Sequence, residues 1–116
     1  MLTLPSGIKI WMTKEAINMH ASFDGLAALA EKTCAQSVFE GHLFIFHNKR
    51  SDKIKILYWD RNGFVQWYKR LEKGVFRFPK IGEAYRLTVS ELNLLLEGID
   101  LTEKKRFNKV NCSSVN

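Results

Sequence analysis

Cationic side chains are concentrated in one part of this chain, between Lys49 and Lys80. This segment contains ten Lys and Arg residues and three acidic residues, a net charge of +7, whereas the rest of the chain contains eight basic and nine acidic residues. Clustered cations of this kind bind phosphate groups or an acidic protein surface. The alternative is a solvated sheet face whose charges only keep the protein soluble. The candidate nucleic-acid-binding residues are Lys49, Arg50, Lys53, Lys55, Arg61, Lys69, Arg70, Lys73 and Arg77.

Two tryptophans of the same segment, Trp59 and Trp67, are candidate stacking residues. Flat rings beside cations are the combination with which proteins hold the bases and phosphates of a nucleic acid. If a hairpin closes at Arg61 and Asn62, we expect both rings to share one sheet face with Lys53, Lys55 and Lys69. The alternative is that both tryptophans pack in the core or against a helix. A shift of one residue in strand register would also move them to the opposite face.

No arrangement of residues typical of an enzyme is recognisable in the sequence. The acidic residues occur mostly in expected turns and helix caps, so they do not form the set that holds two catalytic metal ions. His42 and His47 are five positions apart and would point to opposite faces of a regular strand, and His20 is distant from both. Phosphate-binding glycine loops and nucleophile triads are not recognisable either. We therefore expect a non-enzyme without a cofactor, a metal ion or a small-molecule substrate.

Hydrophobic periodicity predicts the elements that position these residues. The chain has 116 residues, of which 14 are aromatic, and is expected to form one domain with a small core. A helix is predicted at residues 23–35 with Ser22 as its N-cap, and a second helix begins with a capping box from Thr88 to Glu91 and ends near Gly98. Strands are predicted at residues 8–12, 42–47, 53–59, 64–71 and 75–78.

These elements indicate an α+β fold: a small antiparallel β-meander of about four to five strands, packed with two helices, with one basic face left open. We expect residues 1–100 to form this single domain and residues 101–116 to be a polar, flexible tail. Cys34 and Cys112 have the spacing of neither a disulfide framework nor a zinc site. Since no secretory signal or membrane-spanning run is recognisable, we expect a cytoplasmic protein that has no membrane partner.

Four separate stretches of the sequence resemble one known family. They are residues 22–29 (SFDGLAAL), 41–64 (GHLFIFHNKRSDKIKILYWDRNGF), 69–79 (KRLEKGVFRFP) and 87–100 (LTVSELNLLLEGID). In this order and spacing they resemble the small TnpB accessory proteins of bacterial mobile elements of the insertion sequence sixty-six (IS66) family. The resemblance implies a supporting role in DNA transposition beside a separate, larger transposase and another accessory protein. It implies no catalytic residues in this chain, because the transposase carries them.

Two hypotheses of function follow from the charge pattern and the resemblance. In the first, a basic β-hairpin face binds the DNA backbone, either non-specifically, near the element ends or on a displaced strand, while the transposase supplies the choice of sequence. In the second, the protein is an adapter that docks on the transposase without touching DNA, and its basic face meets an acidic surface. RNA binding on the sheet is a weaker third hypothesis, since no aromatic signature of an RNA-recognition motif is recognisable.

Overall fold

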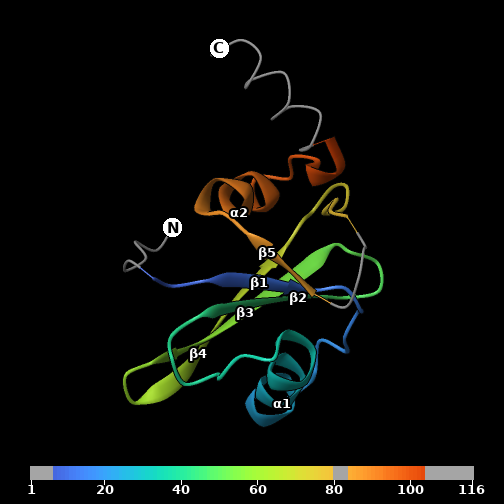
Figure 1. Ribbon diagram of the computed structural model, residues 1–116. Coiled ribbons are helices and arrows are strands. Elements are labelled where there is room, and N and C mark those ends of the chain that lie inside the picture. The colour runs from blue at the N-terminus through green and yellow to red at the C-terminus, as the bar shows by residue number, and fades with distance from the viewer. Residues whose placement is uncertain (1–6, 80–83, 104–116) are drawn as a thin grey trace, which may run out of the picture.

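The computed structural model describes residues 7–79 and 84–103, which form a five-stranded sheet and two α-helices (Figure 1). In the sheet the strands lie in the order β4-β3-β2-β1-β5. This arrangement confirms the α+β fold expected from the sequence. The bounds of the elements are β1 Ile10–Thr13, α1 Phe23–Cys34, β2 Leu43–His47, β3 Lys53–Asp60, β4 Gly63–Arg70, β5 Ala84–Leu87, α2 Val89–Leu96 and the short 3-10 helix η1 Leu101–Glu103.

The sheet is mixed rather than wholly antiparallel. Strands β2, β3 and β4 form the expected antiparallel meander, but β1 pairs in parallel with β2 and antiparallel with the edge strand β5. The prediction of a strand at residues 75–78 is wrong, because these residues belong to no strand or helix. In this segment the Phe76 N–H donates to Ser51 O (2.6 Å), and Arg77 O accepts from the Leu101 N–H (2.9 Å). The segment thus bonds to a turn and to the start of η1 instead of joining a ladder.

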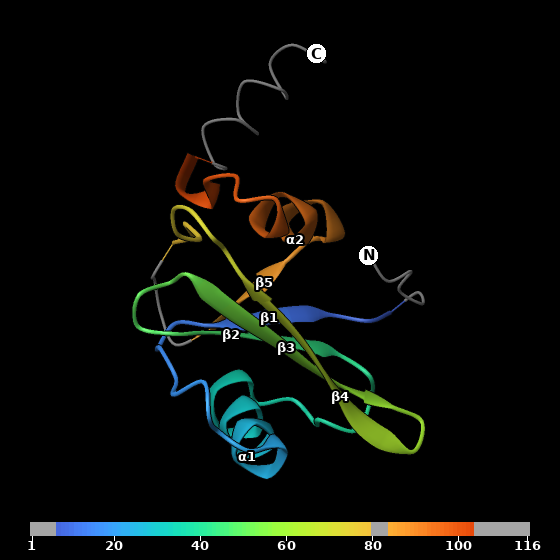
Figure 2. The same cartoon turned by 180° about the vertical axis from the view of Figure 1, so that it is seen from behind.

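Each face of the sheet is covered by one helix (Figures 1 and 2). Every residue of β2 is buried, and its side chains alternate between two cores. Leu43 and Ile45 pack in the core that contains the leucines of α2, whereas Phe44 and Phe46 pack in the core that contains the buried face of α1. The expectation that one basic face stays open is therefore wrong, because both faces of the central strands carry apolar side chains that need cover.

Both helices begin at the predicted caps. Ser22 Oγ accepts from the Gly25 N–H (3.1 Å) at the start of α1. At the start of α2, the Glu91 N–H donates to Thr88 Oγ1 (3.0 Å), and the Thr88 N–H donates to Glu91 Oε1 (2.8 Å). These bonds satisfy backbone donors that a helix start leaves unpaired. Because α2 has only eight residues, its stability depends on its buried leucines as well as on this cap.

The described chain ends in η1, which packs on the same core as α2. Leu101 is 2% exposed and belongs to that core. Residues 104–116, which make up most of the expected tail, lie outside the described residues. Across residues 7–79 and 84–103, no helix has the length and apolar character needed to cross a membrane.

Candidate nucleic-acid interface

A tight turn between β2 and β3 presents the first two candidate cations. The Asn48 side chain holds this turn: its Oδ1 accepts from the Lys53 N–H (3.0 Å), and its Nδ2 donates to Asp52 Oδ1 (2.6 Å). The Ser51 N–H donates to Asn48 O (3.1 Å), and Ser51 lies in the left-handed region with φ at 59°. The two cations between Asn48 and Ser51 are consequently held in exposed positions.

The chain that follows β4 folds against this turn. The Leu71 N–H donates to Asp52 O (2.8 Å), and the Phe76 N–H donates to Ser51 O (2.6 Å). These two bonds bring cations from distant parts of the sequence to one end of the sheet. We call this set the basic end; it consists of Lys49, Arg50, Lys53, Arg70, Lys73 and Arg77.

The basic end has more cations than its carboxylates can pair. Two acidic residues, Asp52 and Glu72, lie within residues 49–53 and 70–77, so the six cations leave a net charge of +4. Arg70 Nε donates to Glu72 Oε2 (2.9 Å), and this hydrogen bond raises the pKa of the Arg70 guanidinium. In the part of the chain that the structure describes, the other five cations form no salt bridge. Arg50 and Lys53 still help to lower the pKa of Asp52, and Arg77 helps to lower that of Asp100, so these carboxylates offset part of the positive charge that remains for an external anion.

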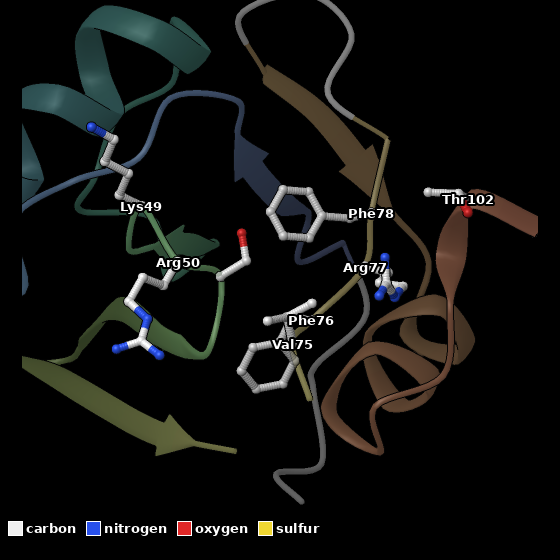
Figure 3. Close-up of a pocket in the computed structure, with 8 residues that line it drawn as sticks. Lys49, Arg50, Val75, Phe76, Arg77, Phe78 and Thr102 are labelled. Atoms are coloured by element: carbon white, nitrogen blue, oxygen red, sulfur yellow. The ribbon is translucent and has the colours of Figure 1, made fainter. Parts of the chain in front are cut away.

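A pocket with a volume of about 260 Å³ opens at the basic end, between the β2–β3 turn and residues 75–78 (Figure 3). Thr102 reaches its rim because the Leu101 N–H bonds to Arg77 O, and no local sequence pattern indicates this contact. Ser51 and Val75 also carry no sequence signal of such a role. The side chains that line the pocket are those of Lys49, Arg50, Ser51, Val75, Phe76, Arg77, Phe78 and Thr102.

Two of the candidate cations are used inside the fold. Lys55 is 6% exposed, its Nζ donates to Met19 O, and the same atom lies 5.3 Å from the centroid of the Tyr68 ring. Lys69 Nζ donates to Leu96 O (2.6 Å) and so places a positive charge at the carboxyl end of α2, where the helix dipole favours it. Neither ammonium group belongs to the basic end.

The β3–β4 hairpin closes with the predicted two-residue loop, but its register separates the two tryptophans. Odd-numbered residues of β3 lie opposite even-numbered residues of β4. Trp59 therefore lies on the side of α1 and Trp67 on the side of α2. The expected shared face is wrong: Lys53 and Lys55 lie on the face of Trp59, and Lys69 lies on the face of Trp67.

Both tryptophan rings take part in packing. Trp59 lies edge-on to Phe39 and to Phe64, with ring centroids 5.1 Å apart in each pair. Trp67 packs against the core on the side of α2. Phe39 is 58% exposed, and the nearby Arg61 side chain in the hairpin loop is 93% exposed. We call Phe39, Trp59, Phe64 and Arg61 the aromatic tip; it lies at the opposite end of β3 and β4 from the basic end.

The two buried histidines connect loops to the sheet. His42 Nδ1 accepts from the Lys9 N–H (3.0 Å), and its Nε2 lies 3.3 Å from Glu40 Oε2. His47 Nε2 lies 2.8 Å from Lys14 O. Within the described ranges, no three His, Cys, Asp or Glu side chains are grouped so that they could hold a metal ion.

Comparison with known proteins finds one family and close relatives. The family model described as "IS66 Orf2 like protein" matches residues 8–106. "Uncharacterized protein y4jC" of Sinorhizobium fredii is 32% identical over 101 residues, which cover 86% of this chain and 86% of the relative. "Uncharacterized protein y4hO" of the same organism is 30% identical over 100 residues, which cover 84% of this chain and 87% of the relative. No solved structure matches the chain significantly.

The carboxylate of Asp52 gives the β2–β3 turn a testable pH dependence. The Asn48 hydrogen bond lowers the pKa of Asp52, and the charges of Arg50 and Lys53 lower it further. A lowered folded-state pKa stabilises the fold above the ordinary pKa, about 4, and this stabilisation is lost as the pH falls through the folded-state value. We expect Asp52→Asn to lower the free energy of unfolding at pH 6, measured by urea denaturation, and the difference from the unaltered protein to shrink below about pH 4. A difference that stays constant from pH 6 to pH 3 contradicts this account.

Proposed function

This chain belongs to the IS66 Orf2-like protein family, which has an accessory role in transposition, and from that premise we propose that it binds the DNA backbone through its basic end. The observation that carries the proposal is the gathering of six cations, with a net charge of +4, by two backbone hydrogen bonds between distant segments. Membership of this family connects the chain with DNA transposition. The cluster of cations indicates which part of the protein surface binds the DNA.

Contacts of this kind place a protein on DNA without reading its sequence. Lys and Arg side chains on turns neutralise phosphates and release counterions, and phosphates are the same in every sequence. The proposed role is therefore non-catalytic. The protein holds DNA, near the element ends or elsewhere, while the transposase makes the choice of sequence and performs the chemistry.

The salt dependence of DNA binding tests this proposal. If the basic end neutralises about four phosphates of a duplex, the plot of log affinity against log salt has a slope of about −3.6. Replacing Arg50 and Arg77 together with Gln removes two of these contacts, so the expected slope is about −1.8. Fluorescence anisotropy of a labelled duplex at several salt concentrations measures both values.

Arg61→Gln is the control for position, because it removes an exposed guanidinium at the aromatic tip, at the opposite end of the hairpin from the basic end. We expect this variant to keep the slope of the unaltered protein. Lys69→Gln is expected to lower stability without changing the slope, because Lys69 Nζ bonds to Leu96 O. Absence of binding to both duplex and single-stranded DNA at low salt, or an equal effect of Arg61→Gln, overturns the proposal.

The second candidate function is that of an adapter docking on the transposase, and the aromatic tip is the observation that favours it. Phe39 is the most exposed large apolar side chain of the described residues, and it contacts two further aromatic rings beside an exposed arginine. Aromatic and arginine side chains carry much of the binding energy of protein interfaces. This tip is distant from the basic end, so the two functions use different surfaces.

Binding of the purified transposase from the same element tests the adapter function. We expect Phe39→Ser to weaken that binding by about thirtyfold, because loss of an interface anchor costs about 2 kcal/mol. Phe23→Ser is the matched control, since Phe23 is a second exposed phenylalanine, at the start of α1. Equal binding by both variants and the unaltered protein in isothermal titration calorimetry contradicts the adapter function.

A further inference from the structure

The pocket at the basic end combines two kinds of surface that a plain phosphate-binding patch does not need. Arg50 and Arg77 lie on opposite sides of the Phe76 and Phe78 rings (Figure 3). Phe76 and Phe78 are only 2% and 3% exposed, so the apolar floor between the cations is formed mostly by the half-buried Val75, with the two rings beneath it in the core. A phosphate needs only the cations. The apolar floor instead suits a flat group with an apolar surface that is covalently attached to anions.

A nucleobase in a single strand has this chemistry, since its ring is apolar on both faces and a phosphate flanks it on each side. The pocket volume of about 260 Å³ is below the range of pockets that enclose drug-sized ligands, so it suits one ring system rather than a whole nucleotide. At the rim, the Ser51 hydroxyl can donate to or accept from the polar edge of a base, and the Thr102 hydroxyl, which donates to Asp100 Oδ1, can accept from it.

We propose that this pocket receives one unpaired base of a DNA strand, while Arg50 and Arg77 hold the phosphates on its two sides. The inference rests on the proposed function, because it names the form of DNA that the basic end prefers. In an uninterrupted duplex the bases are stacked and paired, and a base enters a pocket only after it has been unstacked and unpaired. The basic end therefore prefers single strands, flaps and branched DNA to intact duplex.

The carboxylates of Asp100 and Asp52 near the pocket accept hydrogen bonds from other groups of the protein. Asp100 Oδ1 accepts from the Thr102 N–H (2.8 Å) and from the Thr102 hydroxyl, and Asp52 Oδ1 accepts from the Asn48 amide (2.6 Å). Their negative charge is outnumbered at the rim by Lys49, Arg50 and Arg77, so the approach of a polyanionic strand remains favourable.

A strand without bases gives the sharpest test on the unaltered, full-length protein. Three labelled probes are compared by fluorescence anisotropy at one salt concentration: a single strand, a deoxyribose-phosphate strand of equal length that carries no bases, and a blunt duplex. We expect the single strand to bind about tenfold more tightly than the baseless strand, which has the same phosphates. We also expect it to bind more tightly than the duplex.

The outcomes separate this inference from the proposed function. Binding of the single strand and the baseless strand with equal affinity overturns the pocket inference and leaves backbone binding in place. A duplex that binds as tightly as the single strand also overturns it. Failure of all three probes to bind at low salt overturns the proposed function and this inference together.

A variant that fills the pocket provides a second test without a change of charge. Thr102→Leu places a bulkier, non-aromatic side chain at the rim, and Asn93→Leu places the same side chain on the exposed face of α2 as the control. We expect Thr102→Leu to bind the single strand and the baseless strand equally, and Asn93→Leu to keep the tenfold preference. Retention of the preference by a folded Thr102→Leu protein overturns the inference, and the baseless strand tests it on the unaltered protein even if this variant does not fold.

Discussion

The burial of β2 and of the middle of β3 on both faces determines where charge can lie in this protein. A lysine on such a strand must find a hydrogen-bond acceptor inside the fold, because an unpaired buried charge is strongly unfavourable. Lys55 meets this requirement with Met19 O, and Lys69 on β4 bonds to Leu96 O. The other seven candidate cations lie at the ends of β3 and β4, in turns and in the segment after β4. The charge excess of the sequence thus becomes a basic end rather than a basic face.

The two ends of the β3–β4 hairpin consequently differ in chemistry. One end carries the cations and a pocket with an apolar floor, and its geometry depends on hydrogen bonds from Phe76 and Leu71 to the β2–β3 turn. The other end carries the aromatic tip, in which Phe39, Trp59 and Phe64 contact one another. The two candidate functions proposed above use these two ends separately: the cationic end for DNA, and the aromatic tip for docking on the transposase.

Features with a local physical cause were predictable from the sequence. Both helices, their caps at Ser22 and Thr88, the β2–β3–β4 meander and the two-residue hairpin loop follow from periodicity and from turn and cap chemistry. The concentration of cations between Lys49 and Lys80 was also recognisable from the sequence. The resemblance to the IS66 family, carried by four stretches, agrees with the family match over residues 8–106.

Features that depend on contacts between distant segments were not predictable. The shared face expected for Trp59 and Trp67 is a different case, because the predicted two-residue loop itself places odd-numbered residues of β3 opposite even-numbered residues of β4 and so puts the two rings on opposite faces. The expected strand at residues 75–78 failed because its apolar residues are also compatible with an irregular segment buried against a turn. No local sequence pattern predicts that Thr102 lines the pocket. Its position depends on the hydrogen bond from the Leu101 N–H, at the start of η1, to Arg77 O.

The most direct test of the central claim, that the basic end is the surface that meets DNA, is a map of amide chemical shifts. The ¹⁵N-labelled protein is titrated with a short single strand and followed by heteronuclear NMR at low and at moderate salt. The account predicts that amides of residues 49–53 and 71–78 shift, that added salt reverses the shifts, and that amides of residues 59–64 at the aromatic tip stay in place. Shifts centred on residues 59–64, or on the face of the sheet near Lys55, would contradict the account.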